Sequence, residues 1–155
     1  MNQQIGIIRK VRSHLLEMVK DLSLEQLNEI PEGFNNNIIW NLGHLVAAMQ
    51  GLCYRRSGLE LTVPETFFEA YKPGSKPQHI VDGQEWELVK DLLLTSLDSL
   101  EQDLALHSAR FAHYDAFTTR YGVPLDNIQA AIGFLPFHEG LHTGYIMALK
   151  RVVLR

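Results

Sequence analysis

Two histidines in the last third of the sequence have the spacing of a metal-binding pair. His138 and His142 lie four residues apart in the segment His138-Glu139-Gly140-Leu141-His142, so a helix would place both imidazoles on one face. The pattern H-E-x-x-H also occurs in zinc metallopeptidases, where the glutamate is the general base and a third ligand follows downstream. No His, Asp, Glu or Cys occurs from Thr143 to Arg155, which argues against a peptidase.

The third ligand is expected from an earlier helix, and His44 is the best candidate. It lies in segment 38–54, the most apolar part of the sequence. Its helical face carries one aromatic and three small residues, which would leave room for a cavity: Trp40, Ala47, Ala48 and Gly51. On the residues alone, core histidines satisfied by hydrogen bonds are an equal alternative to a metal site in the bundle interior.

The other candidate residues are weaker. Cys53 is the only cysteine, which excludes a thiolate-rich zinc cluster. It lies nine positions after His44, and at about 100° per residue it faces the opposite side of the helix as a small buried hydrophobe. Glu139 points about 100° away from His138 and is expected to orient a ligand or to meet solvent. Solvent exposure is expected for the remaining histidines, His14, His79, His107 and His113.

Four segments have the apolar spacing of helices in a bundle. The first carries a stripe with spacings of three and four residues: Ile8, Val11, Leu15, Met18 and Leu22. The second runs from about residue 38 to 56 behind an asparagine cap. The third follows Asp82-Gly83-Gln84-Glu85, which resembles a capping box. The fourth follows Asp126, with a predicted core stripe of Ile128, Ala131, Leu135, His138, Leu141, His142, Tyr145 and Leu149.

Long connections separate these helices, at residues 59–81 and 107–125. Such connections fit crossovers better than short hairpins, so the sequence predicts an all-α fold: an antiparallel four-helix bundle with long crossover connections, as a single domain over residues 1–155. No segment has the alternation of a strand. Pro136 removes a backbone donor just before the histidine pair, and a kink or local unwinding is expected there.

The composition argues against nucleic acids and membranes as partners. The net charge is −4, with 14 basic and 18 acidic residues, and without a basic block the chain is not expected to bind nucleic acid. Charged residues interrupt the N-terminal segment from Arg9 onward, so no signal peptide is predicted and the protein is expected in the cytoplasm. No segment reaches the ~20 apolar residues of a membrane-spanning helix, so no membrane partner is expected.

Two segments resemble the signature segments of the DinB/YfiT-like superfamily. They are Asn37-Ile38-Ile39-Trp40-Asn41-Leu42-Gly43-His44-Leu45 and His138-Glu139-Gly140-Leu141-His142-Thr143-Gly144. The resemblance extends to residues 27–31, 74–77 and 122–127, in the same order. It implies a four-helix bundle with one divalent metal ion, usually nickel or zinc, on His44, His138 and His142.

The resemblance leaves three functions open. Some members of the family resemble metal-dependent S-transferases that use a low-molecular-weight thiol such as bacillithiol, mycothiol or glutathione, and this is the leading hypothesis. A metal-dependent hydrolase and a non-catalytic bundle with a structural metal are the alternatives. Three neutral ligands suit either enzyme, because the metal keeps its full charge and open positions. The resemblance also implies a small-molecule substrate and a homodimer.

Overall fold

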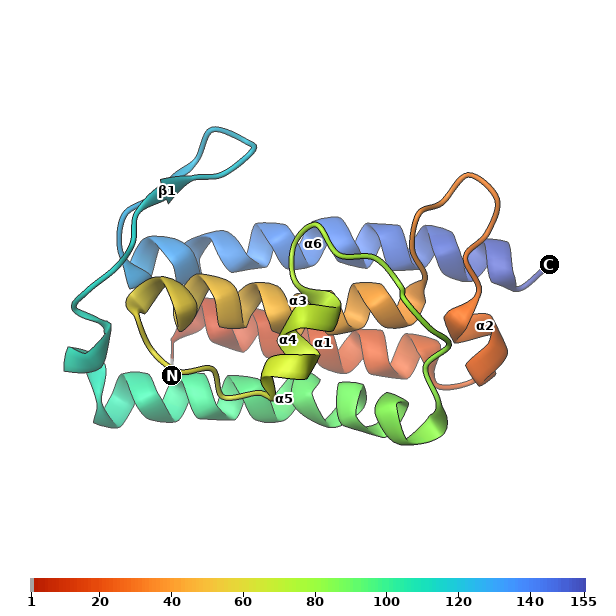
Figure 1. The fold of residues 1–155 in the computed structure, drawn as a ribbon, viewed down its shortest axis with the longest axis horizontal. Helices are drawn as coiled ribbons and strands as arrows, with labels where there is room; N and C mark the ends of the chain where they lie inside the picture. The colour runs from red at the N-terminus through yellow and green to blue at the C-terminus, as the bar shows by residue number, and fades with distance from the viewer. Residues whose placement is uncertain (1) are drawn as a thin grey trace.

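The computed structural model describes residues 2–155, and four long helices lie side by side in it (Figure 1). These helices are α1 (Gln3–Val19), α3 (Ile38–Cys53), α5 (Gly83–Leu106) and α6 (Ile128–Val153). The short elements are α2 (Leu24–Asn28), η1 (Arg55–Ser57), α4 (Glu65–Tyr71), η2 (Ser108–Phe111), β1 (Phe117–Thr118) and β2 (Pro124–Leu125). The predicted all-α bundle is confirmed.

The packing order places the two helices that carry the histidines next to each other. α3 packs against both α6 and α5, and α1 packs against the same two helices. α1 and α6 run in one direction along the bundle, and α3 and α5 run in the other (Figure 1). The connection from α3 to α5 is therefore a crossover between parallel neighbours, and its helix α4 lies against α3.

Polar side chains fix the first turn of each long helix. The Asn37 side chain accepts from the Trp40 amide at 2.8 Å, and the Asn127 side chain accepts from the Ala130 amide at 2.9 Å. Each bond satisfies an amide that has no partner within the helix. Asp82 caps α5 in the same way, so the predicted starts of the last three long helices are confirmed.

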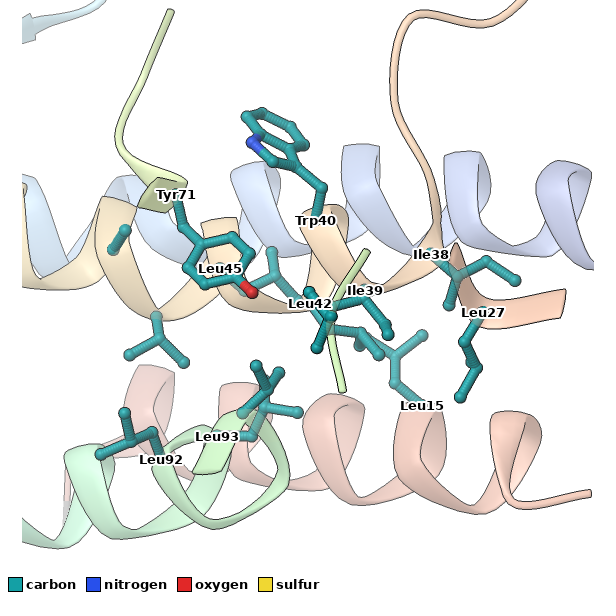
Figure 2. Packing of buried hydrophobic residues seen from close by; sticks show 14 of the residues in the cluster. Leu15, Leu27, Ile38, Ile39, Trp40, Leu42, Leu45, Tyr71, Leu92 and Leu93 are labelled. Carbon is teal, nitrogen blue, oxygen red and sulfur yellow. The ribbon is translucent and has the colours of Figure 1, made fainter. Parts of the chain in front are cut away.

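The core between α1, α3 and α5 is made of aliphatic side chains. In Figure 2, Leu42 of α3 points toward Leu15 of α1 and Leu93 of α5, and all three are fully buried. Trp40 points to the other side of α3, away from these residues (Figure 2). α3 is therefore packed on two sides, which explains why its sequence is apolar nearly all round.

The α1 stripe differs from the prediction. The buried residues of α1 are Ile5, Ile8, Arg12, Leu15 and Val19, whereas Val11, Met18 and Leu22 of the predicted stripe are only partly buried. The prediction counted apolar residues alone, and it therefore passed over an arginine whose guanidinium is buried among hydrogen-bond acceptors of three other helices.

α6 also differs from the prediction in which face it buries. Leu141 and Tyr145 of the predicted core stripe are 41% and 36% exposed. Four residues of the predicted stripe are buried as expected, Ile128, Ala131, Leu135 and Leu149, and the other buried residues of α6 are Ile132, Glu139, Ile146 and Val153. α6 is helical throughout and continues through Pro136, so no unwound turn forms there. A proline removes only its own amide bond, and α6 is also held by its packing against α1 and α3.

The connection from α5 to α6 contains a small hairpin that the sequence did not predict. β1 pairs antiparallel with β2, with Phe117 opposite Leu125. Strands of two residues are too short to show alternation, so they leave no pattern in the sequence. Across the described residues, no helix is both long enough and apolar enough to cross a membrane.

Candidate metal centre

His44 is buried on the side of α3 that faces α4. Its ring stacks on Trp40, with the centroids 4.7 Å apart and the planes 11° from parallel. Its Nδ1 lies 2.8 Å from the carbonyl oxygen of Tyr71. A carbonyl can only accept, so the neutral imidazole donates through Nδ1–H and keeps the Nε2 lone pair free for a ligand bond.

A glycine allows Tyr71 to reach this position. A Cβ added at Gly43 would lie 2.5 Å from the Tyr71 ring, closer than carbon atoms approach in proteins. The ring therefore lies directly over the α3 backbone, one residue before His44, and this holds the end of α4 where its carbonyl meets the imidazole. The orientation of His44 depends on a contact that any side chain at position 43 would prevent.

His142 is oriented by a second residue of α3. Its Nδ1 lies 2.8 Å from Oδ1 of Asn41. The Asn41 amide group donates to the carbonyl of Asn37 and to Oδ1 of Asn36, both at 2.8 Å, which identifies the remaining oxygen as the acceptor. His142 therefore also donates through Nδ1–H and keeps Nε2 free.

His138 completes the cluster and has an unsatisfied nitrogen. Its Nδ1 is buried and has no hydrogen-bond partner among the described residues. Its ring centroid lies 4.6 Å from that of His142 and 5.2 Å from that of His44. A buried polar atom without a partner is unfavourable, and a metal ion bound directly to this nitrogen would satisfy it.

The three imidazoles converge closely enough to share an ion. One nitrogen from each of His44, His138 and His142 lies within 4.8 Å of the others. The structure thus brings together all three predicted ligands, two from α6 and one from α3, and this donor set fits zinc, nickel or a similar divalent metal. His44 is buried, whereas His138 and His142 are partly buried, so the cluster extends from the interior of the bundle toward its surface.

The electrostatics of the cluster favour neutral imidazoles. Burial, with smaller contributions from His142, His44 and Arg12, lowers the pKa of His138 to about 3. Burial and His44 lower the pKa of His142 to about 4. Burial also lowers the pKa of His44, although the bond to the Tyr71 carbonyl opposes it. Neutral imidazole is the form that binds metals, so the cluster is ready for ligation at neutral pH.

Glu139 neither meets solvent nor turns toward the cluster, which corrects the sequence prediction. It is 0% exposed and faces the bundle core, where its Oε1 lies 2.7 Å from Nη2 of Arg12. Burial raises the pKa of this carboxyl, and the charge and hydrogen bonds of Arg12 oppose that shift. The sequence contained one signal for this pair: Arg12 lies four residues after Ile8 and three before Leu15, within the α1 stripe.

The space beside His44 is also different from the prediction. Ala47 and Ala48 are buried, and a Cβ at Gly51 would meet the Phe68 ring at 3.5 Å. α4 therefore covers the small residues that the sequence suggested as a cavity. Leu141 and Tyr145, which neighbour His142 along α6, are exposed.

The remaining candidates lie where the sequence placed them. Cys53 is fully buried in the apolar cluster with Met49 and Leu97, and burial raises the pKa of its thiol to about 12. The other histidines are all exposed: His14, His79, His107 and His113. The sequence interpretation missed Asn41 and Tyr71. Asn41 could have been found as a polar residue one turn before His44, whereas a backbone carbonyl such as that of Tyr71 leaves no signal.

The fold and the site together define a helical bundle with a three-histidine cluster that could hold a metal ion. The chain belongs to the DinB superfamily: the sequence model of that family matches residues 7–146. No curated protein matches the chain.

Proposed function

We propose that His44, His138 and His142 bind one divalent metal ion, nickel or zinc. The convergence of three neutral imidazoles carries this proposal, because two of them are oriented by Nδ1–H donation and the third has an unsatisfied nitrogen. The cluster contains no carboxylate or thiol. An ion bound there would keep its double positive charge.

The number of ligands favours a catalytic site over a structural one. Structural zinc sites usually have four protein ligands, whereas catalytic sites have three and leave a position open. The cluster offers three. A divalent ion held by neutral ligands supplies one chemical effect, which is to lower the pKa of a thiol or water that reaches it.

We propose that the protein is a thiol S-transferase acting on small molecules. The chain offers no thiolate of its own, because its single cysteine, Cys53, is buried and protonated. A separate low-molecular-weight thiol is therefore required as cosubstrate. Its sulfur forms a bond to an electrophilic carbon, the leaving group departs with the electron pair of the broken bond, and the thiol proton passes to solvent.

The position of Glu139 favours the transferase over a hydrolase. In H-E-x-x-H hydrolases the glutamate removes a proton from water. Here Glu139 is buried in an ion pair with Arg12 and faces away from the cluster, so it is unavailable as a base. A thiol needs less help than water, since its pKa is several units lower.

Metal content tests the first part of the proposal. Protein purified without chelator is expected to contain close to one equivalent of nickel or zinc, and His138→Ala to contain much less. His14→Ala, which removes an exposed histidine outside the cluster, is the matched control. Metal below about a tenth of an equivalent in the wild type, or equal in His138→Ala, would refute the site.

A conjugation assay tests the second part. Metal-loaded protein is mixed with bacillithiol, mycothiol or glutathione and with chlorodinitrobenzene or monochlorobimane. We expect conjugation that needs both metal and thiol, persists in Cys53→Ala and disappears in His138→Ala. Metal-dependent ester or amide hydrolysis in thiol-free buffer, with conjugation no faster than in His138→Ala for every thiol, would instead identify a hydrolase.

A further inference from the structure

Arg12 connects all four long helices from inside the bundle. Its side chain is 0% exposed. The guanidinium donates to the Leu45 carbonyl of α3 at 2.8 Å, to the Leu93 carbonyl of α5 at 3.1 Å and to Glu139 of α6. The Arg12–Glu139 contact has two donors, with Nη2 2.7 Å and Nε 3.1 Å from Oε1. No apolar residue could bond three helices at once in this way.

Two of these contacts are adjacent to histidines of the cluster. Leu45 directly follows His44, and Glu139 directly follows His138 and lies one turn before His142. Arg12 therefore holds the backbone of α3 and a side chain of α6 at the level of the three imidazoles. His138 and His142 are partly exposed, whereas the Arg12–Glu139 pair is fully buried.

Stability alone does not account for the pair. Apolar residues of similar volume often stabilise a core as well as a buried ion pair does, because two charges must be removed from water. The directional hydrogen bonds of the pair instead fix the position of α6 relative to α3. Sliding α6 against α3 by one turn would displace Glu139 by about 5.4 Å, and rotating it by one residue would turn the carboxylate by about 100°. Either movement would break the bonds to Arg12.

We propose that Arg12 and Glu139 are positioning residues for the metal centre. Their pairing fixes the register of α6 against α3, and so fixes the separation between His44 and the pair His138 and His142. This inference depends on the proposed metal site and adds to it two residues that do not touch the ion. Removing the pair is expected to loosen the ligand set and leave the bundle folded.

The test replaces the pair with apolar residues in Arg12→Met/Glu139→Met. This double variant removes one charge of each sign and leaves the Leu45 and Leu93 carbonyls with their ordinary helical partners. The control is Arg9→Met/Glu101→Met, which removes the partly exposed α1–α5 ion pair in which Arg9 lies 2.8 Å from Glu101. Both variants lose the same types of residue, but only the first loses a contact with α6.

Cobalt(II) is the probe, because its visible spectrum reports the coordination geometry and its titration gives the affinity. We expect the Arg12→Met/Glu139→Met protein to bind cobalt about 10–100-fold more weakly than wild type, as other changes behind metal ligands do, with an altered cobalt spectrum and an unchanged far-ultraviolet circular dichroism spectrum. The Arg9→Met/Glu101→Met protein is expected to match wild type in both cobalt readouts.

The outcomes separate the two proposals. If wild type binds no cobalt, the metal site is refuted, and the positioning inference fails with it. If wild type binds and the Arg12→Met/Glu139→Met protein has the same affinity and spectrum, only the positioning inference is overturned. If that variant does not fold, Arg12→Lys decides, because lysine keeps the charge but lacks the planar fork: weaker cobalt binding supports the inference, and unchanged binding overturns it.

Discussion

Acidification from pH 7 to pH 5 is expected to destabilise the metal-free protein through its histidine cluster. In the folded protein the pKa values of His138 and His142 are lowered to about 3 and about 4, whereas both are about 6.5 in the unfolded chain. Below pH 6.5 the unfolded chain therefore binds protons that the folded protein does not bind. The contribution of these two histidines to the free energy of unfolding is fully present above pH 6.5. It is lost as the pH decreases toward 4.

The size of the effect follows from the same pKa values. A histidine that stays neutral when folded but has a pKa of about 6.5 when unfolded costs about 2 kcal/mol of stability at pH 5. Both side chains are partly exposed, so we expect a combined loss of about 2–4 kcal/mol. His44 acts in the same direction, since burial lowers its pKa as well.

Urea denaturation of chelator-treated protein at pH 7 and pH 5 measures this loss. His138→Gln/His142→Gln removes both titrating groups and should make the free energy of unfolding much less dependent on pH. His14→Gln/His113→Gln, which removes two exposed histidines, should behave as wild type does. Equal unfolding free energies of wild type at the two pH values, or the same loss in His138→Gln/His142→Gln, would show that the cluster does not control the acid response.

Two further substitutions test how the ligands are oriented. Gly43→Ala places a Cβ against the Tyr71 ring, and overpacking of this kind costs about 1–3 kcal/mol of stability. Because Tyr71 is displaced, metal binding measured by calorimetry should also weaken. An unchanged affinity would mean that the hydrogen bond from His44 to the Tyr71 carbonyl is dispensable. Asn41→Leu removes the hydrogen-bond acceptor for His142 and should weaken metal binding about 10–100-fold. Asn41→Asp keeps an acceptor and should retain most of the wild-type affinity. Equal affinities of the two variants would show that Asn41 does not orient His142.

The sequence predicted the helices and the pairing of His138 with His142 because both depend on local periodicity. Capping residues such as Asn37 and Asp82 act within one turn of the chain, and an i,i+4 pair is close on any helix. His44 was found because a polar residue is conspicuous in an apolar helix. These signals need no knowledge of the tertiary structure.

The burial of Arg12 and Glu139 was not predicted, because it depends on bonding partners contributed by other helices. A charged residue within an apolar stripe looks like an interruption until its partners are known. The outward position of Leu141 and Tyr145 escaped prediction for a related reason. α6 has apolar residues on several faces, and periodicity does not say which of them meets α1 and α3. The covering of Ala47 and Ala48 by α4 depends on the path of a long connection.

The distribution of the ligands between α3 and α6 also determines when a metal ion can be captured. His138 and His142 form a local pair that any nascent helix could present, but His44 is separated from them by the whole crossover and α5. His44 meets His138 and His142 only when α3 packs against α6, which closes a long loop of the chain. Contacts between residues so far apart in sequence form slowly. In the unfolded chain an ion has only the weak two-nitrogen site. If the proposed site binds a metal ion, uptake is therefore expected to follow assembly of the bundle, at a rate set by access to the folded protein.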